Sequence, residues 1–377
     1  MNNRKIGIEA LGIDVEGGAR TVVFNMIGYL KENLPDAEFV VYLSREEPEL
    51  RAPNIKQVIL PFRKGILSRI FLQLYLPFDV LLRRLDLIHF TKSQANLVLG
   101  PKKVMTIHDL TILQHPEIHS KISVFFWKHI QPLIAKRMDA VITVSEDAAR
   151  DILTTYRLDP DKFHVIYNTS QFDGATPVDP QKAQQVAQAY SLPPEYFFYV
   201  GILALKKNLD TLIEAYKLLD AETAHLPHLL LAGPHYPQSD GSGVLDLVAE
   251  YHLDDKIRYL GRLPREDLFY IFRGAKVFIF PSYHEGFGIP CLEAMQLGVP
   301  VVASKVSAVP EVLGSAGVLI EDYLNPQAWA HALQDLNTHP EKRQRRVAEG
   351  LQRYQAISEK HSLSALVDLY QALLKKQ

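Results

Sequence analysis

The sequence predicts an α/β protein of two doubly wound domains, and three observations carry this prediction. The chain has 377 residues, a length that suits two domains of roughly 150 to 200 residues each. Short apolar runs rich in Val, Ile, Phe and Tyr alternate with stretches of helical periodicity, which is typical of βα units around a parallel sheet. The alternation lapses in the polar, turn-rich segment 169–181, which we interpret as the linker between the domains.

The first domain is expected at residues 1–172, with helices in most of the gaps between its strands. The expected strands are 5–11, 39–44, 56–60, 87–91, 104–108, 140–145 and 164–168. The second domain is expected at residues 190–357, where the same alternation resumes. Its expected strands are 197–201, 228–233, 257–261, 277–282, 301–304 and 317–320. In such proteins ligands bind at the carboxyl ends of the strands and in the cleft between domains.

The composition excludes several classes of function. A hydrophobic content of 47% with 22% charged residues is that of a soluble globular protein, and a formal charge of -2 gives no global reason to bind nucleic acid. The single cysteine, Cys291, excludes an internal disulfide framework and a multi-cysteine metal site. No secretory leader is recognisable, and no run approaches the roughly 18 apolar residues that span a bilayer. We therefore expect a cytoplasmic protein.

A glycine-rich segment in the second domain indicates an anion site. Residues 284–298 read HEGFGIPCLEAMQLG and follow a buried strand. Pro290 fits the first position of a helix and Gly298 fits the position just past its end. The loop before this helix should turn its backbone N–H groups toward an anion at the helix N-terminus. The loop residues expected at the anion are Gly286, Phe287, Gly288 and Ile289.

Two glutamates flank this loop. A carboxylate at Glu285 would repel a phosphate held by the loop, unless the carboxylate is directed at something else, and sugar hydroxyls are the natural target. Glu293 has two interpretations, a favourable interaction with the helix dipole or a second contact with hydroxyls. A nucleotide sugar, whose diphosphate lies between two polyols, would satisfy the loop and both glutamates.

Two further segments are candidate phosphate contacts. Lys206 and Lys207 precede a helix whose expected N-cap is Asn208, a place where cations are disfavoured unless a bound diphosphate reverses the sign. Two solvated loop lysines are the alternative. In the first domain, Gly17 and Gly18 lie between the first strand and a helix, where their N–H groups could approach phosphate. A glycine turn of purely structural origin is the alternative there.

Two more residues have chemistry that bears on a reaction. His108 ends the expected strand 104–108, at the edge where α/β proteins bind ligands, although a lone histidine is more often structural. Cys291 lies near a helix N-terminus, which favours a thiolate, but no base accompanies it in the sequence. We therefore do not expect a cysteine nucleophile.

The region 51–90 combines positive charge with apolar residues. It contains seven basic residues against two acidic ones, a local net charge of +5, around the run FRKGILSRIFLQLYLPFDVLL. Such a region could contact an anionic membrane or hold an acidic or lipid acceptor. A helix packed on its own sheet is the alternative interpretation.

Taken together, these motifs resemble the retaining glycosyltransferases of family 4, whose GT-B fold has two facing Rossmann-like domains. The segment from Glu285 to Glu293 resembles the E-x7-E signature of that family. The resemblance extends over nearly the whole chain, in the family's order. Other similar segments are TIHDLTILQHPE from Thr106, VITVSEDAARDIL from Val141, VIYN from Val165, KKNLDTLIEAY from Lys206 and VPVVASKVSAVPEVLGSAG from Val299.

The resemblance implies a role for each candidate residue. Glu285 would contact the donor sugar, Glu293 the nucleotide ribose, and His108 the transferred sugar. The diphosphate would be held by Lys207 and Lys206, by the amides from Gly286 to Ile289, and by Gly17 and Gly18 of the first domain. The final helix, expected at 358–377, would pack back on the first domain. The sequence departs from the family at Ile202, where arginine is common, which puts more of the phosphate charge on Lys207.

The resemblance also implies a reaction. A hexosyl group of mannose or glucose type would pass from a GDP- or UDP-linked sugar to a hydroxyl of a glycan, lipid-linked or small-molecule acceptor. The configuration would be retained by same-face attack, with no metal and no further cofactor. Separately from the resemblance, the composition predicts a cytoplasmic protein, and the basic-apolar region 51–90 would allow peripheral contact with the inner face of the membrane. Two alternatives stay open, namely a phosphate-using enzyme of the same fold and a non-catalytic protein that binds sugar nucleotides.

Overall fold

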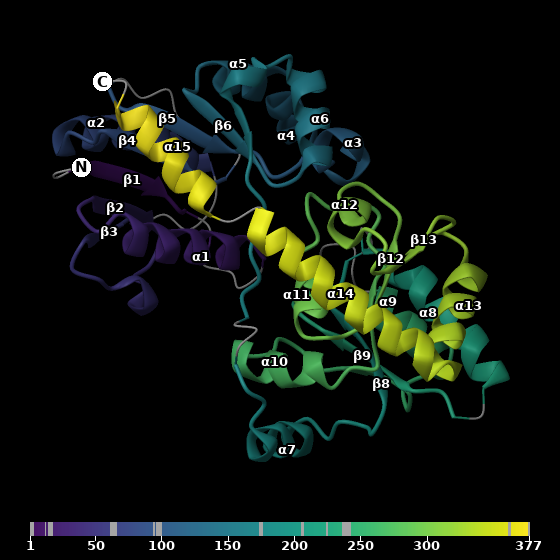
Figure 1. Cartoon of the computed structure of the whole chain (residues 1–377). Coiled ribbons are helices and arrows are strands. Elements are labelled where there is room, and N and C mark those ends of the chain that lie inside the picture. The colour runs from purple at the N-terminus through teal and green to yellow at the C-terminus, as the bar shows by residue number, and fades with distance from the viewer. Residues whose placement is uncertain are drawn as a thin grey trace. The chain divides into compact units, whose positions relative to one another are not determined.

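The computed structural model of the chain consists of two compact units (Figure 1). The first unit comprises Met1–Gln171 with His361–Gln377, and the second comprises Phe172–Lys360. The structure describes residues 4–11, 13, 18–60, 66–92, 95, 100–172, 176–204, 207–223, 225–235, 243–360 and 363–375.

The first unit contains a parallel sheet of seven strands in the order β3-β2-β1-β4-β5-β6-β7. The strand order reverses between β1 and β4, which is the place where doubly wound sheets bind ligands. The strands are β1 (Lys5–Glu9), β2 (Glu38–Leu43), β3 (Ile55–Ile59), β4 (Leu87–Phe90), β5 (Lys102–Thr106), β6 (Ala140–Thr143) and β7 (Phe163–Val165).

Helices cover both faces of this sheet. The α-helices are α1 (Gly18–Asn33), α2 (Ile66–Arg83), α3 (Thr111–Gln114), α4 (Lys121–Phe125), α5 (Gln131–Lys136), α6 (Glu146–Tyr156) and α15 (Ser364–Lys375). A π-helical turn, η3 (Phe126–Ile130), joins α4 to α5, and 3-10 turns occur at η1 (Pro48–Leu50), η2 (Pro116–Ile118) and η4 (Pro160–Lys162). One core cluster joins α1 and α15 to one sheet face, and another joins α2, α5 and α6 to the opposite face.

The C-terminal helix α15 belongs to the first unit, although the preceding helix belongs to the second (Figure 1). Its apolar face enters the core, and Tyr370 is fully buried there. The ring of His89 connects α15 to the sheet, with Nδ1 2.6 Å from Tyr370 Oη and Nε2 2.7 Å from Thr106 Oγ1. Burial lowers the pKa of His89 to about 3, so this network is neutral at physiological pH.

The second unit contains a parallel sheet of six strands in the order β10-β9-β8-β11-β12-β13. The strands are β8 (Tyr196–Val200), β9 (His228–Ala232), β10 (Ile257–Tyr259), β11 (Val277–Phe280), β12 (Val301–Ser304) and β13 (Val318–Ile320). The helices are α7 (Pro180–Ala189), α8 (Leu209–Glu222), α9 (Gly243–Glu250), α10 (Arg265–Arg273), α11 (Ile289–Gln296), α12 (Val309–Leu313), α13 (Pro326–Thr338) and α14 (Pro340–Lys360).

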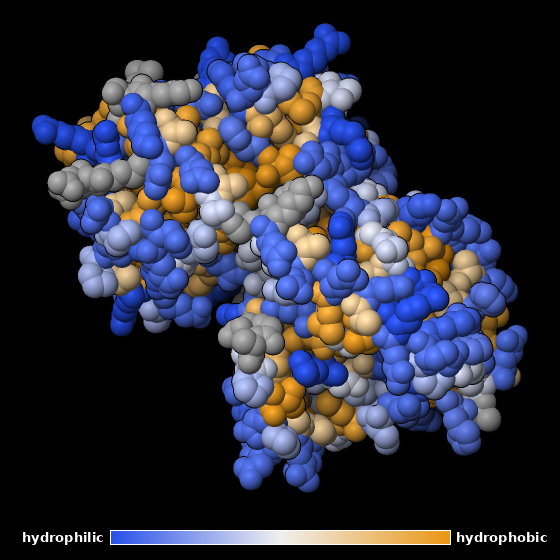
Figure 2. All heavy atoms as spheres, in the orientation of Figure 1, coloured by the Kyte–Doolittle hydropathy of each residue, from blue (hydrophilic) through white to orange (hydrophobic). Residues whose placement is uncertain are grey.

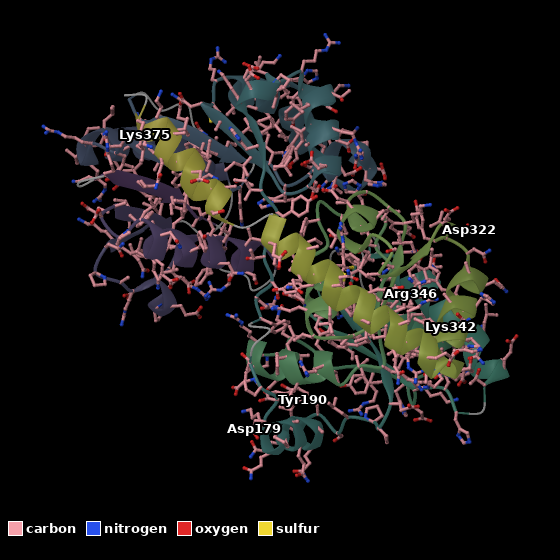
Figure 3. The ribbon with its side chains drawn as sticks, in the orientation of Figure 1. Asp179, Tyr190, Asp322, Lys342, Arg346 and Lys375 are labelled. Atoms are coloured by element: carbon pink, nitrogen blue, oxygen red, sulfur yellow. The ribbon has the colours of Figure 1, made fainter. Side chains whose placement is uncertain are left out.

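Helix α7 is the first helix of the second unit, which begins at Phe172. The Asp179 side chain caps it by accepting a hydrogen bond from Gln181 N at 2.9 Å. At the other end of α7, Tyr190 Oη donates to Asp267 Oδ2 of α10 at 2.8 Å (Figure 3). The segment expected as a linker, 169–181, therefore includes the first residues of a helix that is attached to the second unit.

The predicted fold class is confirmed. All thirteen strands expected from the sequence are present among the described residues, seven in one parallel sheet and six in the other. The expected and observed ends differ by a few residues. The strand expected at 104–108 is Lys102–Thr106, so His108 lies two residues beyond the strand rather than at its last position. None of the described helices is long and apolar enough to cross a membrane.

Candidate active site

An ion pair lies at the point where the strand order of the second sheet reverses. The reversal is between β8 and β11. Lys207 follows β8, Glu285 follows β11, and Lys207 Nζ donates a hydrogen bond to Glu285 Oε1. Both side chains are largely buried, at 15% and 17% exposure. The ammonium also lies 5.9 Å from the centroid of the Phe280 ring, within the range of a cation–π contact.

The glycine-rich loop connects Glu285 to the start of helix α11 (Ile289–Gln296). Gly288 is the N-cap of α11 and has a φ of 96°, a left-handed conformation that side chains other than glycine rarely adopt. The helix begins at Ile289, one residue before Pro290, and the predicted glycine past its end is present as Gly298, with a φ of 71°. The start of an eight-residue helix therefore lies four residues after Glu285 in the chain. Its positive end favours an anion, although Pro290 has no N–H and the N–H groups of Cys291 and Leu292 bond to the carbonyl oxygen of Gly288 at 3.0 and 3.4 Å.

Three charged residues, Lys207, Glu285 and Glu293, all influence the pKa of the buried Cys291 thiol, so they lie near one another. Burial is the main cause that raises the pKa of the Cys291 thiol well above its ordinary value of 9.0. The negative charges of Glu285 and Glu293 add to this rise, and the positive charge of Lys207 opposes it. The sequence-based conclusion that Cys291 is not a nucleophile agrees with a thiol that stays protonated in a buried position.

Glu293 occupies a different place from the one that a helix-dipole role requires. It is the fifth residue of α11, and the first turn of this helix contains no acidic residue. The side chain is buried, with 2% exposure. Glu293 therefore lies beyond the first turn, where the interaction with the helix dipole is strongest. Its charge and that of Glu285 both act on the Cys291 thiol.

The expected N-cap of α8 also differs in its chemistry. Asn208 does occupy the N-cap position, but its backbone is left-handed, with a φ of 52°, and its side chain forms no capping hydrogen bond. Instead, Asn208 Nδ2 donates to the carbonyl oxygen of Tyr323 at 2.8 Å. The side chain thus ties the lysine loop to the segment after β13, so it fixes the loop that carries Lys207.

A second pair of side chains was not identified from the sequence. His284 Nδ1 and Ser307 Oγ share a hydrogen bond of 2.6 Å. Ser307 is left-handed, with a φ of 47°, and the next residue, Ala308, donates its N–H to the carbonyl oxygen of Glu285 at 3.5 Å. The loop after β12 therefore contacts both His284 and Glu285. Two ordinary loop residues far apart in the chain give no sequence signal for such a contact.

The first unit brings other candidates to the carboxyl ends of β1, β4 and β5. His108 Nε2 lies 3.1 Å from the carbonyl oxygen of Thr91, and because a carbonyl only accepts, Nε2 carries the proton. Burial lowers the pKa of His108, so the neutral ring keeps Nδ1 as an acceptor. Glu9, at the end of β1, is 3% exposed, and burial raises its pKa to about 7. Glu9 was not identified from the sequence, although an acidic residue within the apolar run KIGIEAL is a signal that could have found it.

Several predicted contacts cannot be placed. Gly17 and Lys206 lie outside the described residues, whereas Gly18 is the exposed first residue of α1. Among the residues that the structure describes, no group of three or more His, Cys, Asp or Glu side chains could hold a metal ion.

Comparison with known proteins identifies the family. The sequence profile described as "Glycosyl transferases group 1" matches residues 181–353, and the profile described as "Glycosyltransferase Family 4" matches residues 16–169. O-antigen chain mannosyltransferase B of Escherichia coli is 32% identical over 276 residues, which cover 72% of this chain and 71% of that protein. The chain belongs to glycosyltransferase family 4.

Other relatives of this glycosyltransferase are longer. The serotype-specific mannosyltransferase WbdA of Escherichia coli is 30% identical over 64% of the chain, but the match spans only 29% of that protein. Among solved structures, the sucrose-phosphate synthase of Thermosynechococcus elongatus has a TM-score of 0.80 at 21% identity, covering 99% of this chain and all of that one. The Anabaena protein HepE in complex with UDP-glucose has a TM-score of 0.76 at 19% identity, with 99% and 100% coverage. The fold is therefore GT-B.

Proposed function

We propose that this glycosyltransferase moves a mannosyl group from a nucleotide diphosphate sugar to a hydroxyl of a glycan or lipid-linked glycan, with retention of configuration and without a metal. The similarity to O-antigen chain mannosyltransferase B supports the sugar and the class of acceptor. The complex of HepE with UDP-glucose shows that this fold accommodates a nucleotide sugar. For this chain we propose a donor linked to GDP or to UDP.

The observation that carries the proposal is the Lys207–Glu285 pair at the strand-order reversal of the second sheet. A diphosphate bound at the start of α11 would become a new partner for Lys207, because the ligand carries more negative charge than one carboxylate. Glu285 would then be released to accept hydrogen bonds from the hydroxyls of the donor sugar. One arrangement thus binds the anion and the sugar next to each other.

Lys207 also supports chemistry that proceeds without a metal. As the bond to the diphosphate breaks, negative charge grows on the leaving oxygens, and a fixed cation with helix amides stabilises that charge. His108, neutral and with Nδ1 free to accept, is proposed to hold a hydroxyl of the transferred sugar, and Glu293 a hydroxyl of the nucleotide ribose. The other donor contacts proposed are Gly17, Gly18, Lys206, Gly286, Phe287, Gly288 and Ile289.

Retention is proposed to arise from attack on the same face that the diphosphate leaves, with a leaving-group oxygen as the base. In this proposal Glu285, released from Lys207 by the diphosphate, accepts hydrogen bonds from hydroxyls of the donor sugar and does not attack the anomeric carbon. NMR of the product formed from an α-linked donor should show an α-linkage. A covalent mannosyl adduct on a carboxylate would contradict this mechanism.

The test combines binding with turnover. A thermal-shift panel of GDP, UDP, ADP and their sugar conjugates should identify one nucleotide that raises the unfolding temperature. Release of that nucleotide from its sugar conjugate, with a glycan acceptor, should fall about 100- to 1000-fold in Lys207→Ala. Activity that needs inorganic phosphate instead of a nucleotide, or ligand binding without any turnover, would refute the proposal.

Lys276 offers a matched control. Its side chain is 12% exposed, close to the 15% of Lys207, and it is paired with Glu195 at 2.8 Å in the same unit. It precedes β11, so it lies at the amino ends of the strands, whereas Lys207 lies at their carboxyl ends. Lys276→Ala should therefore lose stability without losing turnover by more than a few fold. Equal losses of activity in the two variants would show that the effect is structural.

A further inference from the structure

We propose that Glu9 is a positioning residue of the transfer reaction, whose protonated side chain holds the start of the segment between β1 and α1. This segment leads to Gly17 and Gly18, the phosphate contacts proposed above for the first unit. The inference rests on the proposed function for the reaction that Glu9 affects. The effect of Glu9 on the segment itself can be measured without turnover.

Glu9 is the acidic member of an otherwise apolar row across the first sheet. In the register of the parallel strands it lies between Tyr42 of β2 and Phe90 of β4, so the three side chains point to the same face. The row continues to Val58, Met105 and Val141, and all its apolar members belong to the core cluster shared with α2, α5 and α6. Hydrophilic residues cover much of the first unit in the view of Figure 2, whereas Glu9 is 3% exposed. A carboxylate in such a row costs free energy unless its neighbours compensate it.

Hydrogen bonds of Glu9 connect two parts of the carboxyl edge of the sheet. Its Oε1 accepts from the backbone N–H of Leu11 at 2.8 Å, at the turn that follows β1. Its carbonyl oxygen accepts from Thr91, at 2.8 Å from Oγ1 and at 3.3 Å from N. The carbonyl oxygen of Thr91 lies 3.1 Å from His108 Nε2, which donates to it. Glu9 therefore lies where the chain toward α1 meets the segment that holds His108.

The charge of Glu9 changes near neutral pH. Burial raises the pKa of Glu9 to about 7, and the bond from Leu11 and the positive charge of Lys92 oppose this rise. Lys92 follows β4 by two residues, and its charge also contributes to lowering the pKa of His108. A carboxyl group that titrates in this range therefore lies at the same edge of the sheet as a proposed sugar contact.

Other titratable side chains on the neighbouring elements are engaged elsewhere. On the α2 side, Tyr42 Oη donates to Asp79 at 2.9 Å, and Asp79 is paired with Arg83. On β4, His89 faces the opposite side of the sheet, where its Nδ1 lies 2.6 Å from Tyr370 Oη. Lys92 is thus the cation that acts on Glu9, and the charge state of Glu9 depends mainly on its burial.

The two charge states of Glu9 should hold the segment after β1 differently. The protonated carboxyl suits the apolar row and keeps its bond to Leu11. Water stabilises the carboxylate, so ionisation favours conformations in which the side chain leaves the row and releases Leu11. The segment toward α1 is therefore held below pH 7 and loosened above it. Leucine would complete the apolar row, so packing alone does not explain an acid at this position.

The first measurement is the pH dependence of kcat/KM, from release of GDP from GDP-mannose or of UDP from UDP-glucose with a mannose oligosaccharide as acceptor. Above pH 7, kcat/KM of the wild type should fall about tenfold per pH unit relative to Glu9→Gln, because the amide has the shape of the neutral acid but does not ionise. Glu9→Leu should be at least as stable as the wild type at pH 8 and yet lose about 10- to 100-fold in kcat/KM at pH 6. Parallel pH profiles of the wild type and Glu9→Gln, or full activity of Glu9→Leu, would overturn the proposal.

Hydrogen exchange of peptides that cover residues 10–18 gives a readout without turnover. After correction for the intrinsic rate, these amides should exchange about tenfold faster at pH 8 than at pH 6 in the wild type, following the ionised fraction of a group that titrates near 7. Glu9→Gln should show no such change. Lack of turnover with both nucleotide sugars would refute the proposed function, whereas equal exchange in the wild type and Glu9→Gln would refute this inference.

Glu38→Gln is the matched control. Glu38 begins β2 at the amino edge of the same sheet, where it is paired with Lys5 of β1 at 3.7 Å. This variant should keep the pH profile and the hydrogen exchange of the wild type. If it changed both as Glu9→Gln does, the effect would come from removing any carboxylate of this sheet, and the role proposed for Glu9 would be wrong.

Discussion

Ser307 provides the sharpest test of how the loop with Glu285 is held in place. Its backbone is left-handed, with a φ of 47°, and its hydroxyl shares a 2.6 Å hydrogen bond with His284, the residue before Glu285. Residues with a strained backbone persist where the surrounding structure holds them, often at functional sites. Two substitutions separate the strain from the hydrogen bond. Ser307→Ala removes the bond and keeps the strain, whereas Ser307→Gly removes both.

The expected changes in the free energy of unfolding follow from these two contributions. Loss of the hydrogen bond costs about 1 kcal/mol in either variant. Glycine relieves roughly 1 to 2 kcal/mol of backbone strain, but its greater freedom in the unfolded chain costs about 0.5 to 1 kcal/mol. Ser307→Ala should therefore be destabilised by about 1 kcal/mol, and Ser307→Gly should have nearly the stability of the wild type.

Activity should follow a different pattern from stability. If the bond to His284 holds Glu285 in place, both variants should lose about 10- to 100-fold in kcat, because both lose the bond. Urea unfolding and initial rates of nucleotide release measure the two quantities on the same preparations. A glycine variant with full activity would show that the hydrogen bond does not position Glu285. Equal stability of the two variants would show that the left-handed backbone is not strained.

Three other residues give predictions on stability and reactivity. Burial raises the pKa of Glu9 from 4.5 to about 7, so the stability from its protonated form is present below pH 4.5 and is lost as pH rises through 7. Between pH 4.5 and 7 the free energy of unfolding of the wild type, measured in urea, should therefore fall by about 3 kcal/mol more than that of Glu9→Gln. Tyr370→Phe, which removes a partner of buried His89, should lower the free energy of unfolding by about 1 to 3 kcal/mol. Cys291, buried and protonated, should react with iodoacetamide in mass spectrometry only after unfolding, and labelling of the native protein would contradict this.

The fold could be predicted because its signal is local and repeated. Each strand is a short continuous run of apolar residues, whereas the segments between the strands have apolar residues at helical spacing. Strand ends were less predictable, because a terminal residue of a strand is defined by pairing with a neighbour that the sequence does not reveal. The strand expected at 164–168 pairs with β6 only over Phe163–Val165, for this reason.

The site was predictable where one residue type has few structural uses. Gly298 was expected just past the end of a helix, and it occupies that position with a left-handed backbone. Asn208 was predictable in position but not in role, because a carbonyl from Tyr323, distant in the chain, binds the side chain that would have capped α8. His284 and Ser307 were not predictable at all, since their contact depends on two loops that meet only after the sheet has formed.

The Lys207–Glu285 pair connects these observations to a single physical requirement. The reversal between β8 and β11 brings a lysine loop and a glycine-rich loop together, and an anion site there would leave a largely buried cation unpaired when no ligand is bound. Glu285 compensates that charge in the ligand-free protein. In the proposed mechanism a carboxylate in this position therefore has two uses that do not compete. It neutralises Lys207 until a diphosphate binds, and it would then face the sugar that the diphosphate carries. The same reasoning explains why an acidic residue belongs beside a loop shaped for an anion.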